Sequence, residues 1–143
     1  MKASDLMIGD WVQFFSKYVG NAIGVIGGIE PREGSVEPST FSVFKYIKDK
    51  EEVKTHVFFG VSRHFVKGIP LTQEILEKNG FARLSTTYLL QGNDSFWLDN
   101  PSNPNDYKDN YWIRVNERGI NIKYVHELQH ALKLCGIEKE IVL

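Results

Sequence analysis

Residues 41–47, FSVFKYI, largely alternate apolar and polar side chains, a pattern typical of a β-strand that buries one face. The charged segment 49–52 follows this strand and is typical of a turn. Residues 53–61 then return to apolar and β-branched side chains. We therefore predict a β-hairpin formed by these two strands, at the centre of the N-terminal half of the chain.

The residues before this hairpin extend the β pattern to the N-terminus. Ile8-Gly9-Asp10 is a turn signal ahead of an apolar strand that starts at Trp11. Residues 18–29 are rich in β-branched side chains and are interrupted by Gly20, Gly24, Gly27 and Gly28, which is typical of bends and bulges in a curved sheet. Four or five short curved strands within residues 1–70 predict a small SH3-like β-barrel.

The C-terminal half mixes helix and strand signals. Thr72 is a good N-cap and Gly80 a good helix terminator, so a short helix is predicted over residues 73–79 that buries Ile75 and Leu76. Two hairpins are predicted next, the first from strands near residues 88–90 and 96–98, the second from strands 111–115 and 120–124. A helix over 125–134 follows. We expect an α+β protein in which this lobe, residues 71–143, packs against the barrel as one unit.

The composition is that of a globular protein without a strong overall charge. The chain has 143 residues, 42% of them hydrophobic, and its 17 basic residues nearly balance its 18 acidic ones. This balance excludes a global attraction to nucleic acid or to an anionic membrane, although it does not bear on a local patch. Cys135 is the single cysteine, and neither a secretory signal nor a membrane span is visible. We expect a cytoplasmic protein with no membrane partner.

A motif with known chemistry lies near the end of the sequence, His126-Glu127-Leu128-Gln129-His130. Zinc peptidases use this spacing because two histidines one helical turn apart can hold the metal while the glutamate acts as general base. On the predicted helix, an apolar stripe is formed by Val125, Leu128, Leu132 and Cys135. The face that carries His126 and His130 is centred about 160° from this stripe. We therefore predict that both imidazoles point outward, to solvent or to a partner, and that Cys135 is buried.

A catalytic zinc site also needs a third protein ligand. After His130 the only carboxylates are Glu138 and Glu140, which lie past the predicted helix end at Gly136. We therefore interpret the motif as a chance match, and we assign no catalytic, cofactor-binding or metal-ligating residue. The alternative is a zinc-dependent hydrolase that uses His126 and His130 as ligands and Glu127 as base.

Three further segments occur along the chain. They are Leu6-x-Ile8-Gly9-Asp10-Trp11-Val12, Ile69-Pro70-Leu71-Thr72-x-Glu74-x-Leu76-x-x-x-Gly80-Phe81 and Tyr124-Val125-His126-x-Leu128-Gln129. In this order they resemble an uncharacterised family of small proteins from anaerobic gut bacteria and their phages and other mobile elements. The resemblance spans nearly the whole chain and implies no activity. It implies that Gln is common at the position of Glu127 and that other residues are common at the position of His130, and Met7 departs from it because a basic residue is usual there.

The strands of residues 41–66 mix aromatic side chains with Lys, Arg and His. The aromatic residues of this mixture include Phe44, Tyr46, Phe58, Phe59 and Phe65. Stacking combined with positive charge is how barrel surfaces hold single-stranded nucleic acid, so nucleic-acid binding by these strands is a second alternative. Acidic residues offset half of the Lys and Arg charge of residues 41–69. The leading hypothesis is therefore a non-catalytic binding or adaptor protein of mobile-element type, with an unknown protein or nucleic-acid partner, no cofactor, and an open oligomeric state.

Overall fold

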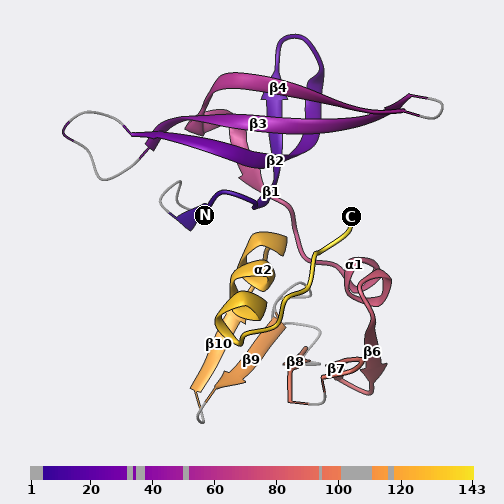
Figure 1. The fold of residues 1–143 in the computed structure, drawn as a ribbon. Coiled ribbons are helices and arrows are strands. Elements are labelled where there is room, and N and C mark those ends of the chain that lie inside the picture. The colour runs from indigo at the N-terminus through magenta and orange to yellow at the C-terminus, as the bar shows by residue number, and fades with distance from the viewer. Residues whose placement is uncertain are drawn as a thin grey trace. The chain divides into compact units, whose positions relative to one another are not determined.

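The part of the chain that the structure describes contains two antiparallel β-sheets and two α-helices, which confirms the predicted α+β class (Figure 1). The computed structural model describes residues 5–31, 34, 38–49, 52–93, 95–100, 111–115 and 118–143. The chain divides into two compact units, an N-terminal unit, Met1–Ile69, and a C-terminal unit, Pro70–Leu143. Within the described ranges, no helix is long and apolar enough to cross a membrane.

The N-terminal unit is built on one five-stranded sheet. Its strands are β1 (Trp11–Ser16), β2 (Gly20–Pro31), β3 (Pro38–Asp49), β4 (Glu52–Ser62) and β5 (Val66–Gly68), with a one-turn 3-10 helix, η2 (Arg63–Phe65), between the last two. The strand order is β4-β3-β2-β1-β5, and every neighbouring pair is antiparallel. The hairpin predicted at the centre of this half is β3–β4, whose pairing continues to Asp49 opposite Glu52.

This sheet is strongly curved. Phe14 on β1 and Phe58 on β4 have ring centroids 5.1 Å apart, although β2 and β3 lie between these strands in the sheet order. The curvature encloses a core whose buried members are Leu6, Val12, Phe14, Ile26, Phe41, Val43, Val61 and Val66. Among the residues that the structure describes, no pairing joins the edge strands β4 and β5, so the sheet does not close into the barrel that the sequence predicts.

The glycines of β2 allow neighbouring groups to approach its backbone closely. The register between β2 and β3 shifts between Ile26 and Gly28, as expected for a bulge. At Gly27 a Cβ atom would lie 2.2 Å from the Phe44 ring, which therefore occupies the place of a side chain. These glycines belong to a bent strand, as the sequence predicts.

The opening segment of the chain forms a turn that is fixed to β2. The backbone N–H of Asp10 donates to the Met7 carbonyl at 3.2 Å, and Gly9 has a φ of 97° as the third residue of this turn. The buried Asp10 carboxylate accepts from the Met7 N–H at 2.7 Å. The Gly9 N–H donates to the Ile26 carbonyl at 2.7 Å. The Ile8-Gly9-Asp10 signal therefore marks a structural turn.

The C-terminal unit is a five-stranded meander with one helix before it and one after it. The elements are α1 (Gln73–Lys78), β6 (Phe81–Leu84), β7 (Thr87–Leu90), β8 (Trp97–Asp99), β9 (Tyr111–Val115), β10 (Arg118–Ile122) and α2 (Val125–Leu134). The strand order β10-β9-β8-β7-β6 follows the chain, and both predicted hairpins and both predicted helices are confirmed. Thr72 caps α1 as predicted, because its hydroxyl accepts from the Ile75 N–H at 3.3 Å. Leu76 is buried, whereas Ile75 is only partly buried.

The sequence did not predict β6, which pairs with β7 from Phe81 opposite Leu90 to Leu84 opposite Thr87. The two strands are joined through Ser85 and Thr86, and Ser85 has a φ of 57°. This left-handed conformation is rare outside glycine, asparagine and aspartate, so the turn carries no recognisable sequence signal.

The C-terminal tail, residues 137–143, returns to α1 and is held there by Asn79 (Figure 1). The buried Asn79 amide donates to the Val142 carbonyl at 2.7 Å and accepts from the Val142 N–H at 2.8 Å. It also donates to the Ile75 carbonyl at 2.8 Å. One side chain thus joins the end of α1 to the tail, and Ile141 beside this contact is buried.

Candidate functional site

The zinc-like motif lies on α2, which spans Val125–Leu134 as the sequence predicts. Val125, Leu128 and Leu132 are buried, which confirms the apolar stripe. Two details of the predicted helix orientation are wrong. His126 does not face solvent, because only 1% of its surface is exposed, and Cys135 is exposed where burial was predicted.

The burial of His126 has an identifiable cause at the start of α2. The Tyr124 ring stacks on the imidazole with centroids 5.6 Å apart and an interplanar angle of 12°. The segment before α1 also runs along this start, because Pro70 bridges Tyr124 and the Leu71 N–H donates to the Lys123 carbonyl at 2.8 Å. A helical projection treats the helix alone and therefore omits both neighbours.

Glu127 caps the helix that carries the motif. Its carboxylate accepts from the backbone N–H of Lys123 at 2.6 Å and from that of Tyr124 at 3.1 Å. Tyr124 is the N-cap and Glu127 the third helical residue, which is the geometry of a capping box. The group that would act as general base in a zinc peptidase is therefore directed back to the N-terminus of its own helix.

The two histidines of the motif are close to each other. The His126 and His130 rings have centroids 5.9 Å apart and lie at 72°. Over the parts of the chain that the structure describes, no three His, Cys, Asp or Glu side chains gather closely enough to hold a metal ion. A catalytic zinc needs three protein ligands, and the described residues supply at most this pair.

Replacing Glu127 tests the capping role. Glu127→Ala should lower the free energy of unfolding by about 1 kcal/mol because two backbone N–H groups lose their acceptor, whereas Glu127→Gln keeps an oxygen in place and should lower it less. Urea denaturation followed by circular dichroism measures both, with the exposed Glu138→Ala as control. Equal stability of the Ala and Gln variants would contradict the capping role. Under the zinc-hydrolase alternative, protein purified without added metal would instead hold about one zinc per chain.

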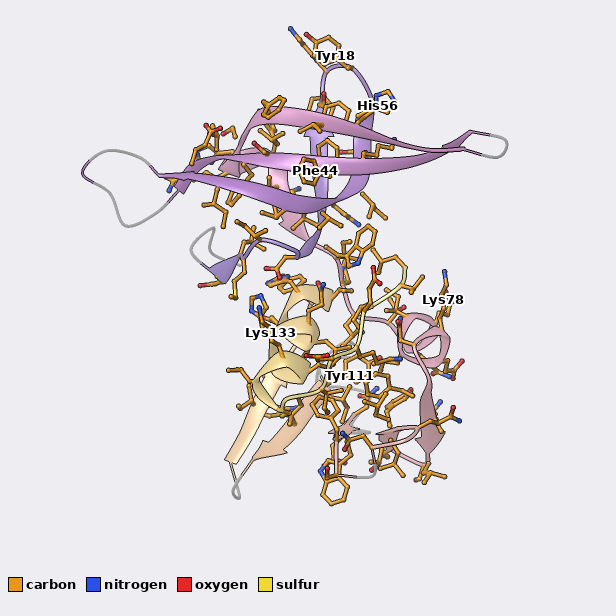
Figure 2. All side chains as sticks on the ribbon, viewed as in Figure 1. Tyr18, Phe44, His56, Lys78, Tyr111 and Lys133 are labelled. Atoms are coloured by element: carbon orange, nitrogen blue, oxygen red, sulfur yellow. The ribbon has the colours of Figure 1, made fainter. Side chains whose placement is uncertain are left out.

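A second candidate site lies on the N-terminal unit, where four aromatic side chains are exposed. The exposed fractions are 44% for Phe15, 78% for Tyr18, 77% for Phe59 and 51% for Phe65. We call these four residues the aromatic surface. Figure 2 shows Tyr18 projecting from the turn between β1 and β2. Exposed apolar side chains that gather in one place mark interaction sites more often than isolated ones do.

Two grooves meet at the aromatic surface. The first has a volume of about 640 Å³ and lies over β1, β2, η2 and β5. The second has a volume of about 610 Å³ and lies over the β1–β2 turn, the end of β4 and η2. Phe15 and Phe65 line both grooves, and their ring centroids are 5.7 Å apart at an angle of 50°. This ring pair therefore forms the boundary between the two grooves.

Polar and cationic groups accompany the rings. Gln13 is paired directly with Ile23 on β2 and with Lys67 on β5, so these three side chains point to the same outer face of the sheet. In the next row of this face Phe15 is paired with Asn21. The Lys17 ammonium lies 4.9 Å from the centroid of the Tyr18 ring, within the range of a cation–π contact.

The aromatic surface overlaps in part with the residues that the sequence singled out. Phe59 and Phe65 are exposed, whereas Phe58 is half-buried against the core and Phe44 covers Gly27. The side chain of Tyr46 lies outside the described residues. The sequence did not point to Phe15 and Tyr18, because only the pairing of β1 decides which of the adjacent residues Phe14 and Phe15 faces outward.

Comparison of the chain with protein-family models, with curated proteins and with solved structures gives no match.

Proposed function

We propose that this protein is a non-catalytic binding protein that uses the aromatic surface to hold its partner. The observation that carries the proposal is the gathering of four exposed aromatic rings around two adjoining grooves. Burying such rings is a large source of binding free energy, because aromatic side chains combine a large contact area with few rotatable bonds.

The architecture of the N-terminal unit supports a binding module of SH3-like type. Its five antiparallel strands and its strong curvature are shared with small barrels, although its described edge strands β4 and β5 do not pair. The three segments that resemble the family of gut bacteria and their phages support a mobile-element origin. The lone Cys135 fits a cytoplasmic location.

The chemistry of α2 supports the non-catalytic part of the proposal. The Glu127 carboxylate accepts two backbone hydrogen bonds at the start of its own helix. A general base must reach the proton that it removes, and this carboxylate is instead directed at the peptide groups of Lys123 and Tyr124.

Binding of anilinonaphthalene sulfonate (ANS), an aromatic anion, tests the aromatic surface. The folded protein should enhance ANS fluorescence in a saturable manner. Phe65→Ala should weaken the affinity about fivefold, because an aromatic pair contributes about 1 kcal/mol beyond the area that it buries. Trp97→Ala is the matched control, because Trp97 is 44% exposed, as Phe15 is, but lies in the C-terminal unit.

The outcome that would contradict the proposal is equally specific. If the wild-type protein does not bind ANS, or if Phe65→Ala and Trp97→Ala change binding equally, the aromatic surface is not a binding site. A thermal melt of each variant, monitored by circular dichroism, separates loss of the surface from loss of the fold, because unfolding intermediates also bind ANS.

A further inference from the structure

We infer that the partner of the aromatic surface is single-stranded nucleic acid, an inference that rests on the proposed binding function. The first argument is the local charge. The residues that line the two grooves fall within 13–23 and 57–67, which carry Lys17, Arg63 and Lys67 and contain no Asp or Glu. The chain as a whole has a formal charge of -1, whereas the Asp- and Glu-free segments at the grooves are positively charged. An anionic partner complements them.

The second argument is the form of the apolar groups. All four residues of the aromatic surface present flat rings, and unpaired bases stack on such rings whatever their sequence. In a duplex the bases are already stacked on each other, so a duplex could offer only its phosphates to this surface. A single strand can stack its bases on the rings and bring its phosphates to the cations.

The third argument is the arrangement on the outer face of β1, β2 and β5. The Gln13 amide lies between Ile23 and Lys67 in the pairing register, and Asn21 is paired with Phe15 in the next row. Amide groups can donate to and accept from base edges, and an ammonium group binds phosphate. Ring, amide and cation are thus neighbours on one sheet face, which is the combination that a single strand needs.

Fluorescence anisotropy with a labelled oligothymidylate of about 12 nucleotides tests the inference, since single-strand sites of small barrels cover about 4–16 nucleotides. A matching duplex and an acidic peptide of similar length serve as competing probes. We expect the single strand to bind most tightly. With about three phosphate contacts, its affinity should fall about twentyfold between roughly 50 and 200 mM salt.

Two kinds of variant separate stacking from charge. Phe59→Ala and Phe65→Ala should each weaken oligonucleotide binding about fivefold to a hundredfold and leave the salt dependence unchanged. Lys67→Gln should weaken binding and lower the magnitude of the slope of log affinity against log salt by about 0.7. Trp97→Ala and Lys133→Gln change an exposed ring and an exposed cation of the C-terminal unit and should change neither quantity (Figure 2). Because Phe59 is 77% exposed, its variant should keep the fold even if Phe65→Ala does not.

The remaining outcomes decide against the inference in different ways. If ANS binds at Phe65 but the oligonucleotide does not bind at low salt, the binding function stands and the nucleic-acid inference is wrong. Tighter binding of the acidic peptide would assign a protein partner instead. If the duplex and the single strand bind with equal affinity, electrostatic attraction alone explains the binding. Base stacking on the rings then plays no part, which also overturns the inference. If neither ANS nor the oligonucleotide binds, both proposals fail.

Discussion

Gly24→Ala should lower the free energy of unfolding of the N-terminal unit by about 3 kcal/mol. A Cβ atom at this position would lie 2.6 Å from the Val43 Cγ1 atom and 2.7 Å from the Phe44 carbonyl oxygen. Val43 is fully buried and the Phe44 carbonyl is part of the β3 backbone, so neither can move aside without displacing the core or the neighbouring strand. One added methyl group is therefore enough to disrupt the pairing of β2 with β3.

Gly28→Ala on the same strand is the matched control. A Cβ atom there meets only the Ser42 Cβ and Oγ atoms, at 3.2 Å and 3.3 Å, and a shift of a few tenths of an ångström relieves the contact. We expect its stability to change by less than about 1 kcal/mol. Urea denaturation measured by circular dichroism compares the two variants. Equal midpoints for Gly24→Ala and Gly28→Ala would contradict the close approach of β3 to Gly24.

Asn79→Ala should lower the free energy of unfolding of the C-terminal unit by about 3 kcal/mol. The change removes the hydrogen bonds to both backbone groups of Val142 and the bond to the Ile75 carbonyl. Since Asn79 is buried, these groups have to find water or stay unsatisfied. Denaturant unfolding gives the loss of stability, and hydrogen exchange at the Val142 amide reports whether the tail has come away from α1.

Asn79→Asp provides a sharper comparison than the alanine variant. An aspartate keeps an acceptor for the Val142 N–H but places a second oxygen against the Val142 and Ile75 carbonyls, where the asparagine N–H group donates. Asn79→Asp should therefore lower the free energy of unfolding at least as much as Asn79→Ala does. Gln91→Ala, at an exposed position of the same unit, should be neutral. Wild-type stability in Asn79→Asp would show that the donor side of this amide is unimportant.

Short sequence patterns predicted the helices and strands that are determined by interactions between residues close together in the chain. The alternation of residues 41–47 marked β3, and the Thr72 cap together with Gly80 marked α1, because a cap and a terminator act within a few residues. The strand β6 was missed because its turn uses Ser85 in a conformation that a sequence does not reveal. Curvature was predicted from the glycines of β2, but closure depends on whether distant edges pair, which no local pattern encodes.

The residues of the candidate sites also fall into those that the local sequence indicates and those that only the folded structure places. Phe59 and Phe65 were recognised because aromatic and basic residues are mixed around them in the sequence. Phe15 joins them only through the pairing of β1 with β2 and β5. His126 is buried with the Tyr124 ring stacked on it, and Tyr124 is in turn bridged to Pro70, which is far away in the sequence. A helical projection contains neither the stacked ring nor the bridging segment.

The capping contact of Glu127 has a consequence for recognising enzymes by short patterns. The start of a helix gains stability from an acidic or amide side chain at its third residue, which is Glu127 in α2, whatever the protein does. With a histidine on either side of that position, this requirement of helix initiation spells out a metallopeptidase signature. Five letters alone would place the chain among the hydrolases, whereas the direction of one carboxylate gives the glutamate among them a structural role where the backbone starts to coil.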